Sequence, residues 1–243
     1  FAVGVRIEHK QDIINKSQYG KYSKFLPNAD YKLTHTCIDG RGVYSFCMCP
    51  GGFVVNASSE ENHLVINGMS NHKRDEENAN SAIVVQVSNK DFGNNIFDGM
   101  NFQRHLEEKA YNLGNGLIPV QLFSDYENNT ISKKFKSVKP IFKGNYKFVN
   151  INDIFPDFIN NDLKEAINYF NNKIDGFNSG DAIIAGVETR TSSPIRIVRG
   201  ENGMSNIDGI YPIGEGSGYS GGITTSAMDG IKISELIAKV YKN

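Results

Sequence analysis

Residues 209–231 read GIYPIGEGSGYSGGITTSAMDGI, with six glycines between Gly209 and Gly222. The run opens with a short apolar segment at 209–213, which predicts a buried strand. It leads into residues 221–239, where an apolar stripe recurs at helical spacing through Ile223, Ala227, Ile231 and Leu236. The stretch therefore predicts a strand, a glycine-rich turn and a helix.

Glycines in front of a helix indicate either a ligand-binding turn or a tightly packed turn, and the residues alone favour neither. A glycine backbone adopts positive φ and approaches a ligand closely, while the N–H groups at a helix start favour an anion or an electron-rich carbonyl. Glycine-rich turns also occur where packing is merely tight. No lysine follows in a Walker arrangement, so a P-loop type of phosphate-binding loop is disfavoured.

Upstream of this run, the sequence predicts an α+β fold with a mostly antiparallel sheet. Amphipathic helices are expected at 101–113, before Gly114, and at 161–174, before Gly176. Residues 123–149 are polar and predict a loop with short strands. Short β-type runs lie at 1–7, 31–37, 42–48, 53–57, 63–67 and 82–87, and runs typical of buried strands follow at 182–188 and 195–199.

The first residue is Phe1, which already lies inside a predicted strand. Proteins usually carry a few loose residues at a terminus, so we expect a piece of a longer protein. A natural start after processing is the alternative.

The composition is that of an ordinary globular protein, with 39% hydrophobic residues and 26 basic against 27 acidic side chains. Without a basic excess, neither nucleic acid nor a membrane surface is an expected partner. No apolar run approaches the roughly 18–20 residues that span a bilayer, and the first residues show no basic segment followed by an apolar stretch of the signal-peptide type. We therefore expect a cytoplasmic location.

Three cysteines, Cys37, Cys47 and Cys49, suggest neither a disulfide framework nor a zinc site. The histidines show no metal-ligand spacing, so no metal is expected from the sequence and no role is given to His35, His63, His72 and His105.

The glycine run resembles the C-terminal FAD-contacting segment of Rossmann-type flavoproteins, with Asp229-Gly230 further along the helix. Other segments, in the same order, resemble the uncharacterised bacterial family of predicted FAD-dependent dehydrogenases: FAVGVRIEH (1–9), YSFCMCPGGFV (44–54), INGMS (66–70), ANSAIV (79–84) and GVETRTSSPIR (186–196).

This resemblance implies a substrate or cap region at 1–200 and a segment at 201–243 that returns to a Rossmann domain missing from the chain. That N-terminal domain, the expected partner, would carry GxGxxG and hold most of the FAD. The helix start would face the flavin and stabilise negative charge as it is reduced. The residues implied to contact FAD are Gly214, Glu215, Gly216, Gly218, Tyr219, Gly221, Gly222 and Ile223.

Cys47 and Cys49 are weak catalytic candidates. Thiols two residues apart on a strand point to the same face, which permits a redox or nucleophilic role. Burial as small apolar side chains is the favoured interpretation, since cysteine is among the most buried residue types. A close approach of the Pro50-Gly51-Gly52 backbone to the flavin is a further reason for this motif.

The connection after residue 188 is the candidate substrate site. Arg190 and Arg196, also weak catalytic candidates, would bind a carboxylate or phosphate or neutralise reduced flavin, and Glu188 would pair with one of them. A surface turn with a weak salt bridge is the alternative. Arg6, Glu8 and His9 are expected on a satisfied sheet surface. The full set of candidate substrate residues is Glu188, Arg190, Thr191, Ser192 and Arg196.

The predicted function is the C-terminal part of an FAD-dependent oxidoreductase acting on a small-molecule substrate, inactive when isolated. A stand-alone domain that binds a small anion without redox chemistry is the alternative, and a structural or interaction domain is a third.

Overall fold

A computed structural model describes residues 1–241, and the chain divides into two compact units. The larger unit comprises Ala2–Val87 and Gln103–Thr189. The smaller unit comprises Phe1, Ser88–Phe102 and the described residues from Arg190 onward. Within residues 1–241, no helix is both long and apolar enough to cross a membrane.

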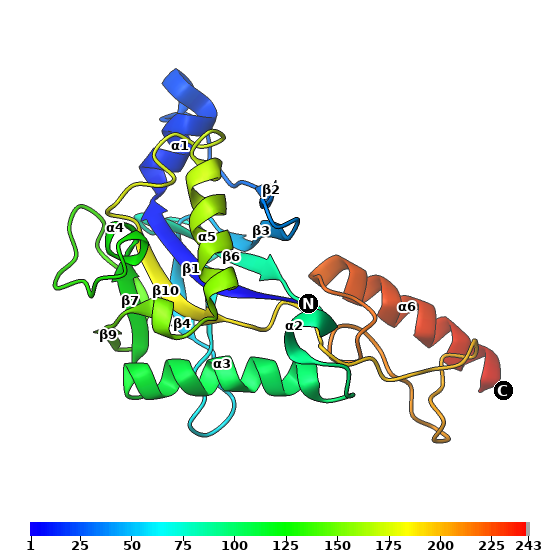
Figure 1. The fold of residues 1–243 in the computed structure, drawn as a ribbon. Coiled ribbons are helices and arrows are strands. Elements are labelled where there is room, and N and C mark those ends of the chain that lie inside the picture. The colour runs from blue at the N-terminus through cyan, green and yellow to red at the C-terminus, as the bar shows by residue number, and fades with distance from the viewer. Residues whose placement is uncertain (242–243) are drawn as a thin grey trace. The chain divides into compact units, whose positions relative to one another are not determined.

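The larger unit is built on a seven-stranded sheet with the order β2-β3-β6-β1-β10-β7-β9 (Figure 1). Neighbouring strands are antiparallel except for the parallel pair β7–β9. The strands are β1 (Ala2–Lys10), β2 (Thr34–Thr36), β3 (Gly42–Cys49), β6 (Asn78–Gln86), β7 (Ile118–Leu122), β9 (Tyr146–Phe148) and β10 (Ile183–Glu188).

A second sheet of three strands has the order β5-β4-β8, with β4 (Gly52–Asn56) antiparallel to β5 (Ile66–Ser70) and parallel to β8 (Phe142–Lys143). The mixed sheets and helices confirm the α+β class. The described residues form six α-helices: α1 (Gln11–Tyr19), α2 (Asn89–Phe92), α3 (Asp98–Gly114), α4 (Phe123–Glu127), α5 (Asp157–Phe170) and α6 (Ile223–Val240), with 3₁₀ turns at Gly20–Tyr22 and Ile151–Asp153.

Strand β1 lies at the centre of the large sheet, between β6 and β10, and is buried on both faces. One face meets the helical layer, where His9 packs against Phe177 with ring centroids 4.6 Å apart. The opposite face meets the second sheet, where Gly68 of β5 lies against the Arg6 side chain. A strand covered on both faces buries its polar residues together with its apolar ones.

Helix α5 forms because apolar residues recur three and four positions apart and bury one face: Ile159, Leu163, Ala166, Ile167 and Phe170. The predicted helix at 161–174 is therefore confirmed, although it begins and ends four residues earlier. The helix at 101–113 lies within α3. Strands β7 and β10 pair, and the sequence had not predicted β7.

The predicted strands at 195–199 and 209–213 are wrong, because both stretches of the described chain form turns and irregular backbone. Their backbone groups bond to turns, since Ile197 N–H donates to Ser217 O and Ile210 O accepts from Ser205 N–H. The helix predicted at 221–239 is confirmed as α6, but its expected buried stripe is not. Ile223 is 90% exposed and Ile231 62% exposed, whereas Ile233 is the buried side chain of this helix.

Candidate functional site

The face of β1 that meets the second sheet holds Arg6, which is fully buried. Its Nε donates to Glu188 Oε2 at 3.0 Å, and one terminal nitrogen donates to Glu188 Oε1 at 3.2 Å. The remaining N–H groups reach the Cys47 carbonyl at 3.0 Å, Asn80 Oδ1 at 2.8 Å and Asn67 Oδ1 at 3.2 Å. We call Arg6, Cys47, Asn67, Asn80 and Glu188 the Arg6 cluster.

The large sheet brings this cluster together from distant parts of the chain. Arg6 and Glu188 lie on the adjacent strands β1 and β10, and Asn80 on β6 at the other side of β1. A Cβ on Gly68 would lie 2.2 Å from the Arg6 Nη1, so glycine at that position leaves room for the guanidinium. The sequence had predicted that Glu188 pairs with Arg190 or Arg196; its bidentate partner is Arg6.

All five N–H donors of Arg6 are engaged, which limits what the guanidinium can do. A ligand would have to displace one of these bonds before the guanidinium could donate to it. Arg6 therefore positions the backbone at Cys47 and the side chain of Asn67, which are both exposed at the edge of the cluster. Burial raises the pKa of Glu188, and Arg6 opposes that rise.

The two cysteines of the motif do not share a face, contrary to the prediction. A bulge between Phe46 and Cys49 interrupts the pairing of β3 with β6, and Cys47 takes a φ of 43°. As a result Cys47 is exposed, while Cys49 is buried and its thiol lies 3.3 Å from the Cys47 carbonyl. Burial raises the pKa of Cys49, although Arg6 opposes this. The burial favoured for this pair is therefore confirmed for Cys49 and wrong for Cys47.

Gly51 and Gly52 are both required by packing within the chain. Gly51 has a φ of 47°, and a Cβ there would lie 1.9 Å from the Arg74 carbonyl oxygen. A Cβ on Gly52 would lie 2.4 Å from the Met69 carbonyl oxygen. These contacts explain both glycines without a nearby flavin.

Glu8 and His9 are buried, which corrects their expected place on a sheet surface. Glu8 Oε1 accepts from Asn78 Nδ2 at 2.7 Å and from the Ile141 N–H at 2.9 Å, while within residues 1–241 its Oε2 accepts no hydrogen bond. Burial raises the pKa of Glu8 to about 7. His9 Nε2 donates to the Phe177 carbonyl at 2.6 Å, and burial lowers the pKa of His9 to about 4. Both side chains are buried most readily in their neutral forms.

In the smaller unit, two glycines of the turn before α6 are required by the turn itself. Gly214 and Gly218 have φ values of 73° and 82°, which side chains with a Cβ rarely adopt. A Cβ on Gly218 would also lie 2.4 Å from the Ile195 carbonyl oxygen.

Three other glycines of the same turn have no such requirement. Gly216, Gly221 and Gly222 do not have positive φ. A Cβ would meet nothing within 4 Å at Gly216, and only ordinary van der Waals contacts of 3.6 Å at Gly221 and 3.5 Å at Gly222. The chain alone would accommodate a Cβ at these three positions. We call Gly216, Gly221 and Gly222 the open glycines.

Helix α6 begins beside the open glycines without a capping side chain. Gly222 is the N-cap residue, with a φ of −148°, and no acidic residue lies in the first turn. The side chain of Ile223, the first helical residue, is 90% exposed. Uncapped N–H groups and the positive end of the helix dipole form a site suited to negative charge.

An arginine–aspartate pair holds this turn in place. Arg199 binds both carboxylate oxygens of Asp229, with one contact at 2.9 Å, and Asp229 also accepts from the Gly214 N–H at 2.9 Å. Hydrogen bonding from Arg199 lowers the pKa of Asp229 to about 2. The Tyr219 ring lies 3.6 Å from Arg199 and 4.2 Å from Arg196, measured from guanidinium carbon to ring centroid.

The structure thus distributes the sequence-predicted residues over both units. Glu188 belongs to the Arg6 cluster, while Arg196 and Tyr219 meet beside the turn. Arg190 and Glu215 are exposed, Ser192 is half-buried and Thr191 is buried. Sequence reasoning had given no role to Arg199 and had expected only a surface position for Arg6.

Residues 1–191 match the family described as FAD-dependent protein, C-terminal domain-like. The chain belongs to this family, which confirms the resemblance to FAD-dependent proteins. A relative in Clostridium beijerinckii, described as an uncharacterized protein, is 49% identical over 248 residues, covering 99% of this chain and 46% of that protein. The chain therefore spans about half the length of this relative. The family match ends before the turn at 214–222, whereas the relative's coverage of the chain is nearly complete.

Proposed function

We propose that this chain forms the substrate-side part of an FAD-dependent oxidoreductase and contributes the helix start that faces the flavin. The observation that carries the proposal is the set of open glycines. Neither backbone conformation nor packing within the chain requires glycine there. Close approach of a group from outside the chain to the backbone is a physical reason for glycine at these three positions. Membership of a family of FAD-dependent proteins supports FAD as this group.

The residues present fit a flavin on the basis of charge as well as space. The uncapped N–H groups at the start of α6 favour a negatively charged or electron-rich edge. Glu215 is exposed in the same turn, where it would reach a hydroxyl rather than a phosphate. The Arg199–Asp229 pair fixes the turn in advance, so little ordering would be needed on binding.

FAD, when bound, would supply the transfer of a hydride or electrons that the protein's own side chains cannot perform. The start of α6 would stabilise negative charge that builds up on the flavin. Arg190 and Arg196, both exposed, would bind an anionic substrate or offset the charge of reduced flavin. Thr191 and Ser192 would complete the substrate contacts.

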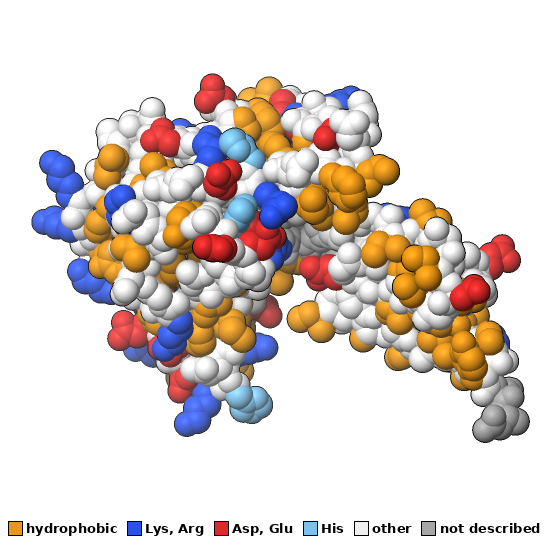
Figure 2. Space-filling view, turned by 90° about the horizontal axis from the view of Figure 1, so that it is seen from below, with side chains coloured by type: hydrophobic (Ala, Val, Ile, Leu, Met, Phe, Trp, Pro, Cys, Tyr) orange, Lys and Arg blue, Asp and Glu red, His pale blue; other side chains and the backbone are white. Residues whose placement is uncertain are grey.

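The N-terminal FAD-binding half of a longer protein is the partner we propose for the smaller unit. Figure 2 shows hydrophobic side chains gathered on the lobe that carries α6. The exposed large hydrophobic residues of the smaller unit include Ile197, Val198, Ile207, Ile210, Ile213, Ile223, Met228 and Ile231. Exposed apolar side chains gathered in one place are typical of a surface that another domain covers.

A matched pair of glycine variants tests the proposal in a full-length protein that contains this chain. Gly222→Ala and Gly230→Ala both add a methyl group that the chain itself accommodates, since a Cβ on Gly230 meets nothing within 4 Å. Gly222 begins α6, whereas Gly230 lies two turns further along it. We expect Gly222→Ala to weaken FAD binding at least about tenfold, a loss of 1.4 kcal/mol, and Gly230→Ala to leave it unchanged.

The readouts are flavin content by absorbance and FAD affinity by titration of the apoprotein. Equal affinity in Gly222→Ala and the parent protein would show that the turn does not contact the flavin. A full-length protein that binds a small anion but no flavin would favour the stand-alone anion-binding alternative.

A further inference from the structure

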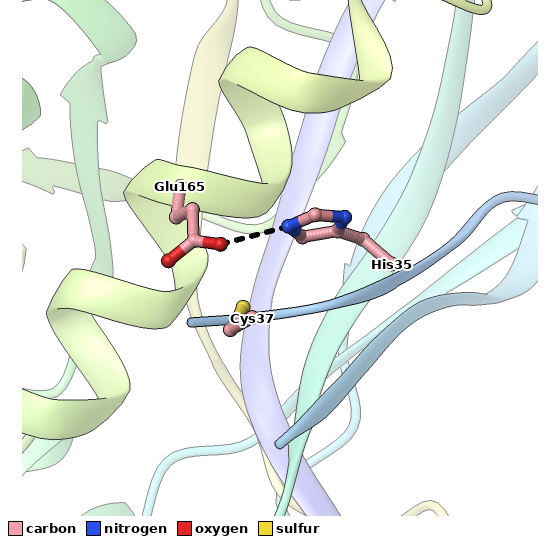
Figure 3. Close-up of side chains that lie close together, drawn as sticks. All are labelled: His35, Cys37 and Glu165. Carbon is pink, nitrogen blue, oxygen red and sulfur yellow. Dashed lines mark hydrogen bonds and ion pairs between the residues drawn. The ribbon is translucent and has the colours of Figure 1, made fainter. Parts of the chain in front are cut away.

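A separate cluster of side chains of the types that can bind metals lies between β2 and α5, within the larger unit (Figure 3). His35 lies on β2 and Cys37 directly follows this strand. Asp162 and Glu165 lie on α5, where residues three apart share a face. The sequence predicted no metal here, because 130 residues separate His35 from Glu165.

The donor atoms already converge. One ligand atom each from His35, Cys37 and Glu165 lies within 4.8 Å of the other two. The shortest separation, 2.8 Å, joins His35 Nε2 to Glu165 Oε1. Donors arranged tetrahedrally at zinc distances of about 2.0–2.3 Å stand roughly 3.3–3.8 Å apart, so adjustments of about an ångström would place an ion among them.

Several contacts fix these side chains in place. The His35 ring stacks on Tyr169 with centroids 4.1 Å apart, and the Glu165 carboxylate also accepts from the Ile38 N–H at 3.1 Å. The Cys37 thiol is buried beside the Asp162 carbonyl, 3.6 Å away. Three donors held by their surroundings lose little freedom when they bind an ion.

Asp162, on the same helix as Glu165, has a buried carboxylate oxygen near the backbone of this cluster. It is 5% exposed, and within residues 1–241 its Oδ2 accepts no hydrogen bond. The Arg41 Nε lies 3.9 Å from this oxygen and 2.9 Å from Asp39 Oδ2. A buried carboxylate oxygen without a donor is costly unless a cation or water meets it.

We propose that His35, Cys37 and Glu165 bind a divalent transition-metal ion of the zinc type. Imidazole, thiolate and carboxylate together select Zn²⁺, or Co²⁺ as its substitute, over Ca²⁺ and Mg²⁺, which prefer oxygen ligands alone. Three protein donors leave one position of a tetrahedral ion open. The ion would join the edge of the large sheet at β2 to α5, and it would be independent of the flavin.

The test measures binding of Zn²⁺ and Co²⁺ to the chelator-treated chain. Zn²⁺ affinity is measured by competition with a chromophoric chelator, and the Co²⁺ complex is recorded as a difference spectrum. Two cluster variants, Cys37→Ser and His35→Gln, are compared with two controls that remove the same kinds of side chain elsewhere, Cys47→Ser and His72→Gln. Circular dichroism establishes that each variant is folded.

We expect one Zn²⁺ per chain, with affinity lowered at least about tenfold in each cluster variant and unchanged in each control. The Co²⁺ complex of the parent chain should show a thiolate-to-cobalt charge-transfer band, which Cys37→Ser abolishes and Cys47→Ser retains. Binding that survives in both cluster variants, or that falls equally in the controls, would overturn the proposal. If a cluster variant does not fold, a Co²⁺ spectrum of the parent chain without a thiolate band overturns it just as well.

Discussion

Replacing Glu188 with glutamine should destabilise the larger unit strongly, because it leaves the Arg6 guanidinium buried without its counter-charge. The substitution preserves the shape of the side chain and removes only the negative charge and one strong acceptor. Arg6 is fully buried, and the side chain of Glu188 is 4% exposed, so water cannot take the place of the lost partner.

The magnitude follows from the geometry of the pair. Breaking a buried ion pair by removing one member costs about 3–5 kcal/mol. The bidentate contacts at 3.0 and 3.2 Å place this pair in that class. In a chain of this size a loss of 1 kcal/mol lowers the melting temperature by roughly 2–4 °C, so Glu188→Gln should lower it by roughly 6–20 °C.

An exposed pair of the same residue types provides the control. Arg104 binds Glu60, with side chains 47% and 37% exposed, and exposed pairs contribute about 0–1 kcal/mol. Glu60→Gln should therefore change the melting temperature by only a few degrees. The chain contains no tryptophan, so unfolding is followed by far-ultraviolet circular dichroism during heating and urea titration.

A double-mutant cycle with Arg6→Met separates the pair from its surroundings. Removing Arg6 alone leaves the Glu188 charge buried and deprives Asn67, Asn80 and the Cys47 carbonyl of their donor. The double variant should therefore cost less than the sum of the two single variants, by about 0.5–3 kcal/mol. Additive costs, or a Glu188→Gln variant as stable as Glu60→Gln, would refute the assignment of a charged buried pair.

Further predictions concern pH, substrate and flavin. The pKa of Glu8 rises from 4.5 to about 7 on folding, so the folded state binds more protons than the unfolded state, and the free energy of unfolding falls by about 3 kcal/mol as pH rises through that window. The pKa of His9 falls from 6.5 to about 4 on folding, so the contribution of His9 to the free energy of unfolding rises with pH by a similar amount. In Glu8→Gln the contribution of Glu8 is removed, so the free energy of unfolding should increase between pH 4 and 6.5 because of His9. If its pH dependence were identical to that of the parent chain, this would contradict a buried neutral carboxyl at Glu8. If the full-length protein has the proposed oxidoreductase activity, Arg190→Met or Arg196→Met should raise KM for an anionic substrate roughly ten- to a hundredfold with unchanged flavin content. If KM and the flavin midpoint potential both stay constant, the loop is only a surface turn. Gly218→Ala should lower the melting temperature of the chain while Gly222→Ala does not, because only Gly218 has positive φ and a backbone atom in the path of a Cβ. The chain alone should purify without flavin absorbance, and a yellow preparation would show that it holds FAD without a further domain.

The local pattern of the sequence was sufficient to predict several features of this protein. Alternating apolar residues identified β1, and apolar residues at helical spacing identified α3, α5 and α6. The glycine run marked the start of α6, and its order among the other motifs pointed to FAD-dependent proteins, which the family match confirmed. These features depend on neighbours within a few residues, which a sequence displays directly.

Apolar content alone misled the prediction at 195–199 and 209–213. Both runs are rich in isoleucine, and Val198 and Ile210 are 78% and 49% exposed. Whether an apolar run becomes a strand depends on a partner with free backbone groups. Here the Ile197 N–H bonds to Ser217 O, in the glycine-rich turn itself.

The pairings that define the sites were decided only by tertiary structure. Arg6 and Glu188 are 182 residues apart, and His35 and Glu165 are 130 apart. Strand order in the large sheet places β1 beside β10, and packing of α5 against β2 brings the second pair together. The spacing of apolar residues along the sequence shows which residues share a face of their own helix or strand. It does not show which other element covers that face. The cost of burying a charge then determines that Arg6 meets Glu188, because neither would be stable there alone.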